Sequence, residues 1–494
     1  MKNLIAIAPL LALSAACAAS AVPARSSGAS APPFAAAVPA AAPDAALAVD
    51  APLDVPIERR APRSDAQAAR WIGASADGDV LQAGLSEADV GVWIDAPRAR
   101  PIRRVPIDLA LVIDTSGSMA GAKLESARAA AKALVENLAD GDIVSIDTFS
   151  DEARSLAPPT RLSAETRPRV LARIATLSPS GSTNMFDGLA LAETHVAQAP
   201  TTHAVRRVVM ISDGIANVGP SSPEALGALA ERGLRSGAQV TSLGVGTDYD
   251  EKTLDALAVK TTGRLYHIAE PREMAALLRR ELDLLTSTVA SDAFVEVVPA
   301  PGVEVIEALG VRAERDGTGA LRLPIGALFA GQHREALVRV RLRDSNPTRA
   351  PRALASVRLH FRDPDDSGLE RVQEVAVRAS FSADQAAIAS SVSPHTRSIA
   401  AVMEAGRLQV AAAQDVNAGQ MTRADDQLAV AQRRLESEAK AMKDEPTRSR
   451  LMAAAQNIES SRAAFAPSAA PMAAPAARKK ALDMNAAGMS QQGF

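Results

Sequence analysis

The sequence lacks most of what marks a disulfide-stabilised, nucleic-acid-binding or multispan membrane protein. Cys17 is the one cysteine among 494 residues, so no disulfide can form within the chain. The formal net charge is −3, without large blocks of one sign, whereas nucleic-acid-binding domains usually carry a basic patch. No segment after the N-terminus is apolar for long enough to span a bilayer. Aromatic residues make up only 3%, but the hydrophobic fraction of 47% still suffices for sizeable cores.

The N-terminus resembles an export signal. A positively charged start and the apolar stretch 4–13 have the length and order of a signal peptide. Cys17 lies where this stretch ends, which resembles a bacterial lipobox, although Leu13 lies one place further from the cysteine than the pattern prefers. Ordinary secretion, with cleavage after residues 19–21, is the alternative. We predict a signal peptide over 1–17 with lipid on Cys17, and a location on the periplasmic or surface side of a bacterial envelope.

Composition divides the rest of the chain. Residues 18–64 are rich in Ala, Pro and Ser, a composition typical of an extended linker. Residues 466–494 repeat that composition, and we predict a disordered tail there. Residues 65–105 contain both tryptophans, Trp71 and Trp93, and are expected to add strands to a later sheet.

Residues 106–286 alternate between apolar runs and helical patterns. This alternation predicts an α/β fold, with a doubly wound, mostly parallel sheet that has helices on both faces. Ligands of such sheets bind at the carboxyl ends of the strands. The expected strands are 107–113, 143–149, 207–211, 239–245 and 264–268.

Two further regions differ in pattern. Residues 287–382 consist of short, often alternating strands separated by Gly, Pro and Asp, which predicts a β-sandwich domain. Residues 383–465 are helical in pattern and predict a C-terminal hairpin or small bundle. Two apolar faces are expected there, one made of Ile399, Val402, Met403, Gly406 and Val410, the other of Leu428, Ala431, Leu435 and Met442.

The loop after the first expected strand, DTSGS at 114–118, could serve several chemistries. A phosphate-binding P-loop needs G-x-x-x-x-G-K-[ST], and only Lys123 fits that pattern after Gly117. An aspartyl-phosphate enzyme usually has a second carboxylate two residues after the nucleophile, where this chain has Ser116. A serine nucleophile needs a partner base, and none of the six histidines lies in a recognisable catalytic motif. We assign no role to Asp147, His195, His203 and His267.

A hard divalent cation fits this loop better. Mg²⁺ takes six oxygen ligands, and residues two apart in an extended loop point the same way, so Asp114, Ser116 and Ser118 can converge. Thr183, in a glycine-bracketed loop before a helix, and Asp213, directly after an apolar strand, stand on the same sheet edge. The sequence therefore predicts a metal site made of these five residues.

Three motifs in this order carry a family resemblance. D-x-S-x-S at 114–118, S-T-N at 182–184 and S-D-G at 212–214 resemble a von Willebrand factor type A (VWA) domain with an intact metal-ion-dependent adhesion site. The order of domains is similar to that of bacterial secreted relatives of calcium-activated chloride channel regulators. The metalloprotease motif H-E-x-x-H of some of those relatives is absent, so proteolysis is not implied.

The resemblance implies a non-enzymatic, metal-dependent protein-binding module for adhesion or assembly. It would hold Mg²⁺, or else Mn²⁺ or Ca²⁺, and bind an Asp or Glu carboxylate of a partner protein. Nucleic acid is not expected as a partner, and the membrane is reached only through the lipid. The alternatives are a structural or assembly factor that acts mainly through its C-terminal helices, and a hydrolase.

Overall fold

The computed structural model describes the greater part of the chain. The predicted signal peptide, Cys17, nearly all of the linker and the C-terminal tail lie outside the described residues. None of the described helices is both long and apolar enough to cross a membrane. The described residues are 63–64, 70–99, 104–246, 249–366 and 368–463.

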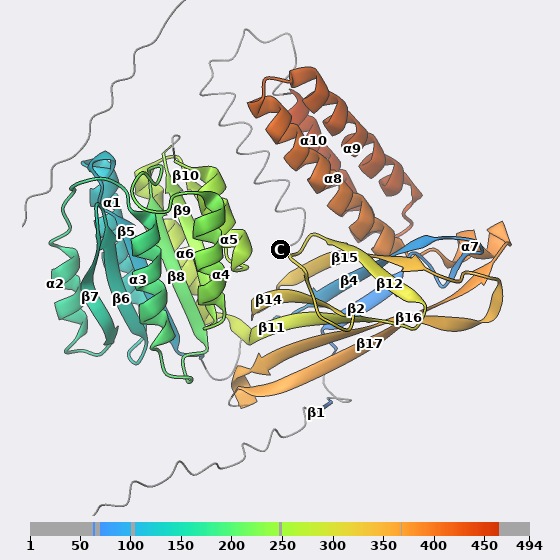
Figure 1. Ribbon diagram of the computed structural model, residues 1–494, viewed down its shortest axis with the longest axis horizontal. Helices are drawn as coiled ribbons and strands as arrows, with labels where there is room; N and C mark the ends of the chain where they lie inside the picture. The colour runs from blue at the N-terminus through green and yellow to red at the C-terminus, as the bar shows by residue number, and fades with distance from the viewer. Residues whose placement is uncertain (1–62, 65–69, 100–103, 247–248, 367, 464–494) are drawn as a thin grey trace, which may run out of the picture. The chain divides into compact units, whose positions relative to one another are not determined.

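A six-stranded sheet forms the centre of the α/β unit. Its parallel strands are β5 (Ile107–Asp114), β6 (Ile143–Phe149), β8 (Val205–Ser212), β9 (Ala238–Val245) and β10 (Leu265–Ile268). The strand order is β10-β9-β8-β5-β6-β7 (Figure 1). From β5 the chain moves first to β6 and later to β8 on the opposite side of β5, so the topology changes direction beside β5. Ligands of open α/β sheets bind at such a point.

The edge strand β7 (Ala153–Arg161) is antiparallel to β6 and was not among the strands expected from the sequence. Pro158 and Pro159 lie within it. A proline cannot donate a hydrogen bond to a neighbouring strand and is therefore confined to sheet edges. The prolines concealed the strand in the sequence, and its edge position explains why they are tolerated.

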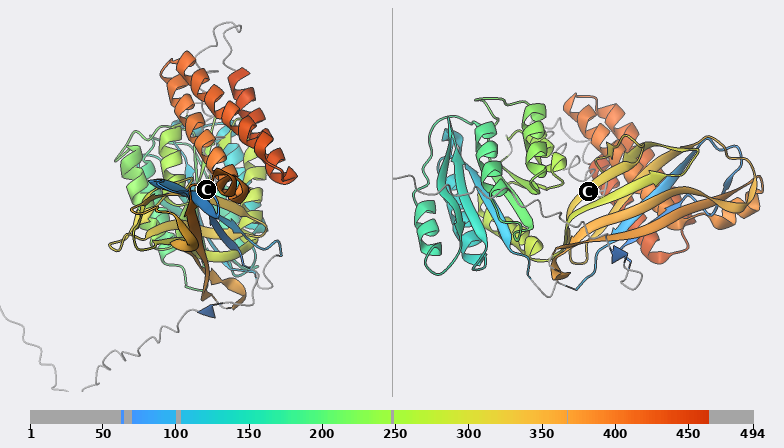
Figure 2. Two further views of the ribbon diagram at one scale, coloured as in Figure 1. Left: turned by 90° about the vertical axis from the view of Figure 1, so that its right-hand side faces the viewer. Right: turned by 60° about the horizontal axis from the view of Figure 1, so that its bottom comes forward.

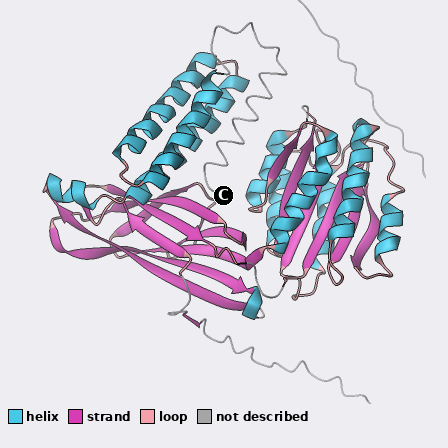
Figure 3. Ribbon diagram, turned by 180° about the vertical axis from the view of Figure 1, so that it is seen from behind, coloured by secondary structure: helices cyan, strands magenta, loops and turns pink. Residues whose placement is uncertain are grey.

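Helices cover both faces of this sheet, as predicted (Figure 3). Side chains alternate along β5, so Leu109 and Leu111 enter one core and Ala110 and Val112 enter the other. The first core is closed by α1 (Ala122–Asn137), α2 (Arg167–Ile174) and α6 (Met274–Thr286). The second is closed by α3 (Met185–Ala197), α4 (Pro223–Leu234) and α5 (Glu251–Lys260).

Two sheets form the β-sandwich. The larger contains β1 (Arg63–Ser64), β3 (Val80–Gln82), β11 (Thr288–Pro299), β13 (Glu314–Arg315), β14 (Leu321–Phe329), β16 (Thr348–Asp363) and β17 (Leu369–Ser382). The smaller has the order β12-β15-β4-β2 and contains β2 (Ile72–Ala76), β4 (Glu87–Asp95), β12 (Val303–Leu309) and β15 (His333–Leu342). Apolar side chains of both sheets, among them Val90 and Val357, share one core. Strands β2 and β4 thus come from the segment that contains Trp71 and Trp93.

The C-terminal region is a bundle that follows the short helix α7 (Gln385–Ser391). Its helices α8 (Pro394–Asn417), α9 (Met421–Ala441) and α10 (Glu445–Ala463) lie side by side (Figure 2). The expected apolar face of α8 is divided between two neighbours. Ile399 and Met403 pack with Leu337 of β15, whereas Val402 packs with Leu428 inside the bundle. The division arises because α8 contacts a sheet and a helix at once.

Candidate metal centre

Asp114 is the last residue of β5 and is fully buried. Its Oδ1 accepts a hydrogen bond from the backbone N–H of Ser116 at 2.8 Å, and its Oδ2 accepts one from the Ser212 hydroxyl at 2.6 Å. Ser116 follows β5 and Ser212 is the last residue of β8, so the carboxylate is held at the carboxyl edge of the sheet. The structure therefore places Asp114 where the sequence predicted it.

The two serines of the DTSGS loop reach the same position by a turn. A short 3₁₀ helix, η1 (Gly117–Met119), begins after Ser116, so the backbone here is not extended as the sequence argument assumed. The hydroxyls of Ser116 and Ser118 nevertheless lie 3.0 Å apart, and the Ser118 hydroxyl donates to Asp213 Oδ1 at 2.8 Å. Ser116 is buried and Ser118 is exposed, so one side of the cluster faces solvent.

Thr183 joins the cluster from the loop before α3. A Cβ atom added at Gly214 would lie 3.4 Å from Thr183 Oγ1, 3.7 Å from Ser118 Oγ and 3.8 Å from Asp114 Oδ2. These three oxygens therefore surround one small space, which a side chain at position 214 would invade. The Thr183 N–H donates to Asn217 Oδ1 at 2.9 Å, and the Asn217 N–H donates to the Thr183 carbonyl at 3.1 Å, which ties the two loops together.

Lys123 is a member of this group that the sequence analysis missed. Its ammonium forms an ion pair with Asp213 Oδ2. The residue is the second of α1, so the turn of η1 brings the first turn of that helix beside the carboxylate. A lysine that follows a predicted metal loop within a helical turn is the signal that could have identified it.

The electrostatics of the cluster favour a bound cation. Burial raises the pKa of the Asp114 carboxyl, hydrogen bonds from Ser116 and Ser212 oppose that rise, and the neighbouring charge of Asp213 adds to it. Two carboxylates and three hydroxyls form a donor set of hard oxygens, the type that Mg²⁺ and Ca²⁺ prefer. The side chains present therefore fit a hard divalent ion.

The histidines to which we assigned no role make contacts elsewhere. His195 Nδ1 lies 3.0 Å from Asp147 Oδ2, and His203 Nε2 lies 3.0 Å from the Gly141 carbonyl. His267 stacks at an angle on Tyr249, with ring centroids 5.5 Å apart. Each of these three histidines thus contacts another part of the fold, and none of these contacts involves the serines of the DTSGS loop.

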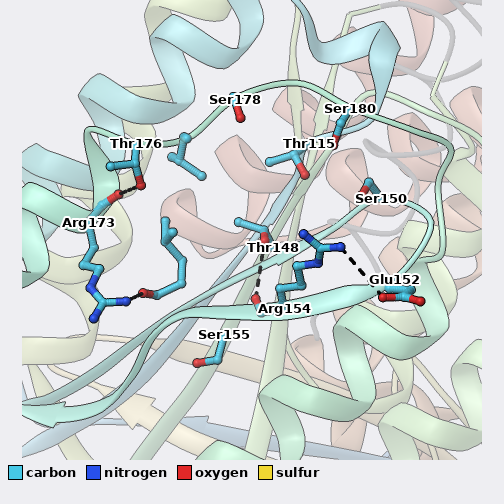
Figure 4. Close-up of a pocket in the computed structure, with 12 residues that line it drawn as sticks. Thr115, Thr148, Ser150, Glu152, Arg154, Ser155, Arg173, Thr176, Ser178 and Ser180 are labelled. Atoms are coloured by element: carbon cyan, nitrogen blue, oxygen red, sulfur yellow. Dashed lines mark hydrogen bonds and ion pairs between the residues drawn. The ribbon is translucent and has the colours of Figure 1, made fainter.

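A polar pocket of about 260 Å³ lies next to the cluster (Figure 4). The backbone N–H of Ser180 donates to the Thr115 carbonyl at 2.6 Å, so the pocket shares a wall with the DTSGS loop. Arg154 and Arg173 supply two guanidinium groups, of which Arg173 donates to the Leu156 carbonyl at 3.2 Å. Hydroxyl-bearing side chains make up much of the remaining lining: Thr115, Thr148, Ser150, Ser155, Thr176, Ser178 and Ser180.

An exposed apolar side chain lies two residues after Asp213 in the sequence. Ile215 is 62% exposed, the largest fraction among the exposed large hydrophobic side chains of the described residues. Its neighbour Ala216 is buried, so the backbone is anchored while the isoleucine projects outward. Single exposed apolar side chains are common on protein surfaces, so the interest of Ile215 lies in its position two residues after Asp213.

These features coincide with a known domain. Residues 108–280 match the family model of the von Willebrand factor type A domain, and the chain contains a domain of this type. Apart from Ile107, the match covers the strands β5 to β10 and with them all five residues of the cluster. It confirms the VWA domain that the sequence motifs predicted, and with it the α/β fold of this unit.

Two curated relatives share this part of the chain. The uncharacterized protein YfbK of Escherichia coli is 29% identical over 197 residues, which are 39% of this chain and 34% of that protein. The human inter-alpha-trypsin inhibitor heavy chain H3 is 28% identical over 181 residues, 35% of this chain and 20% of that protein. The chain thus aligns with about a third of the bacterial relative and about a fifth of the human one.

One solved structure resembles most of the fold. A von Willebrand factor type A protein from Catenulispora acidiphila superposes with a TM-score of 0.66 and 17% sequence identity, and the match covers 84% of this chain and 96% of that one. At this identity the likeness concerns the fold. It extends well beyond the α/β unit.

Proposed function

We propose that the protein is an exported, metal-dependent protein-binding module of the bacterial envelope. It binds an Asp or Glu side chain of a partner through Mg²⁺ held by Asp114, Ser116, Ser118, Thr183 and Asp213. VWA domains are generally interaction modules and typically bind a divalent metal ion. The observation that carries the proposal is the convergence of oxygens from three separate loops around Gly214.

The chemistry of the donors supports an acidic partner. Hydroxyl ligands carry no full charge, so a site with three of them leaves much of the positive charge of the ion unneutralised. Ser118 is exposed, which leaves that side of the site open to a ligand from outside. A carboxylate gains more at such a position than water does, because the ion is the largest local charge.

The surroundings of the cluster support a protein rather than a small anion. Arg154, Arg173 and Glu152 line the neighbouring pocket and give it net positive charge, and Ile215 places an exposed apolar side chain two residues after Asp213. A partner surface with an acidic residue beside an apolar patch would complement both. Interfaces commonly combine a few anchoring residues with a polar rim.

The decisive experiment separates ion binding from partner binding. Calorimetry with Mg²⁺ and Mn²⁺ on the wild type and on Thr183→Ala would be paired with a pulldown from membranes in Mg²⁺ or in chelator. Thr183→Ala should weaken partner capture more than ion binding, since this loop can move toward the ion when a carboxylate arrives. Equal capture in chelator, or a partner that needs no Asp or Glu, would contradict the mechanism.

A second candidate function rests on the C-terminal bundle. Met421, Val430 and Met452 of α9 and α10 are at least 37% exposed, which favours a contact surface on those helices. In this alternative the protein is a structural or assembly factor and the metal site is secondary. Substitution of these three residues by serine would then remove partner capture, whereas Asp114→Ala would leave it unchanged.

Export and anchoring depend on residues outside the described part of the chain. We propose that Cys17 carries lipid and thereby anchors the protein to a membrane. Each buried CH₂ of an acyl chain contributes about 0.8 kcal/mol, so more than one chain is needed for stable attachment. Cys17→Ser should release the protein from membranes; a variant that stays equally bound and is still cleaved correctly would contradict the lipid anchor.

A further inference from the structure

A second group of metal-type ligands lies in the sandwich, away from the DTSGS loop. His333 and Glu335 are two apart on β15, and side chains at this spacing share one face of a strand. His395 is the second residue of α8 and reaches the same place from the bundle. One ligand atom from each of the three lies within 4.8 Å of the other two.

The orientation of each side chain suits a bound ion. His333 Nδ1 lies 2.6 Å from Asp95 Oδ1 on the paired strand β4, and His333 Nε2 lies 2.8 Å from Glu335 Oε1. A histidine that ligates a metal usually donates its other ring N–H to a carboxylate, and Asp95 stands in that position. The Asp95 contact therefore leaves Nε2 directed at Glu335.

His395 supplies an independent indication. Its Nε2 is buried and has no hydrogen-bond partner among the described residues, while it lies 3.7 Å from Glu335 Oε1. The ring is held in place by Trp93, with centroids 4.3 Å apart. A buried nitrogen without a hydrogen bond is uncommon in a protein, and a metal ion between the two rings would satisfy it.

We propose that His333, Glu335 and His395 bind a divalent transition metal of the zinc type, with Asp95 orienting His333. Two imidazoles and one carboxylate form a known zinc ligand set that leaves the fourth position to water. Mg²⁺ prefers oxygen ligands alone, so the two clusters would select different ions. The ion would join β15 to α8, and thus the sandwich to the bundle.

Arg450 gives the proposal a sharp internal test. Its guanidinium binds both carboxylate oxygens of Glu335 from α10. A positive charge on the ligand opposes a second cation, so Arg450→Gln should bind zinc more tightly than the wild type. If the cluster is only an ion-paired contact that holds no metal, Arg450→Gln will not bind zinc.

The experiment uses the full chain with Asp114→Ala, which removes the contribution of the first cluster, and with Trp71→Phe, which leaves Trp93 as the only tryptophan. Zinc uptake is measured by calorimetry. Co²⁺ is then added, because its visible absorption reports ligand geometry and because it quenches a nearby tryptophan. We expect one zinc equivalent, a tetrahedral Co²⁺ spectrum and quenching of Trp93 fluorescence.

Variants assign the ligands. His333→Gln and His395→Gln should each abolish the zinc equivalent, and Asp95→Asn should weaken it about ten- to a hundredfold. His360→Gln is the matched control, since His360 belongs to the same sandwich but stacks on Phe294. Circular dichroism in chelator identifies any variant that fails to fold. If a ligand variant does not fold, the zinc affinities of Asp95→Asn and Arg450→Gln test the proposal instead. No zinc uptake in the parent chain, or equal uptake in the His395 and His360 variants, would overturn the proposal.

Discussion

The cluster around Asp114 and the cluster around Glu335 differ in donor chemistry and in their origin along the chain. The first consists of carboxylates and hydroxyls from the end of β5, the loops after β5 and β8, and the loop between α2 and α3; the sequence motifs predicted all five residues. The second combines two imidazoles and a carboxylate from β15 and α8, with Asp95 of β4 beside His333, and no motif predicted it. The comparison shows that a cluster of side chains is visible in sequence where its members lie in short motifs, and invisible where a sheet meets a later helix bundle.

The largest expected effect separates the two clusters by their ions. Asp114→Ala should weaken Mg²⁺ binding at least about a hundredfold, because it removes a buried carboxylate from a site that has only two. Zinc uptake at His333, Glu335 and His395 should not change. Calorimetry with both ions measures this, and Asp140→Ala, an exposed carboxylate of the same unit, is the control that should retain both.

Glu193, a buried carboxyl outside both clusters, provides a reference for the buried carboxylates within them. Burial raises the pKa of Glu193, on α3, to about 8, although Arg232 partly opposes the shift. The unfolded chain ionises this group near pH 4.5 and the folded chain only near pH 8, so folding stability should fall as pH rises between these values. Glu193→Gln should remove that fall and raise the Tm at pH 8 by about 5 °C.

The pH profile of thermal unfolding checks this prediction. The Tm difference between Glu193→Gln and the wild type should be largest near pH 8 and small below pH 4.5. A difference that does not vary with pH would show that the carboxyl is not held neutral in the folded chain. Its buried Oε1 has no hydrogen-bond partner among the described residues, whereas both oxygens of Asp114 accept hydrogen bonds.

The exposed isoleucine tests whether the Asp114 cluster has a protein partner. Ile215→Ser should weaken partner capture about tenfold, the effect of losing roughly 1.4 kcal/mol of apolar contact, and should leave Mg²⁺ binding unchanged. Val430→Ser on α9 is the matched control, because Val430 is also exposed. If Val430→Ser has the larger effect, the bundle is the contact surface and the second candidate function is favoured.

The smallest expected effect concerns Lys123. Its ammonium neutralises part of the Asp213 carboxylate and repels a divalent ion in the same cluster. Lys123→Gln should therefore tighten Mg²⁺ binding by about fivefold, a size typical of one partly screened charge. Calorimetry of the variant at two ionic strengths measures it. Weaker binding would mean that Lys123 supports the site rather than competing with the ion.

Much of the fold followed from local pattern. The apolar runs that became β5, β6, β8, β9 and β10 were evident because buried parallel strands are continuously apolar. The strand β7 was missed because its prolines disguised it. The apolar face of α8 was correctly identified, but its division between Leu337 and Leu428 was not, since a helical period shows only that a face is buried and not which neighbour buries it.

The sequence by itself determined the α/β unit, its family and the group of five residues at the carboxyl edge of its sheet. Four of them depend on a short-range rule, because the ends of parallel strands and the loops that follow them meet at one edge. Thr183 lies in the loop between α2 and α3 and was indicated by its motif. Only the tertiary structure decided that Lys123 lies on Asp213 and that Asp95, His333, Glu335, His395 and Arg450 come together. Contacts between a sheet and a later helix bundle depend on how the two pack. Nothing in the local sequence around any one of these residues encodes that packing.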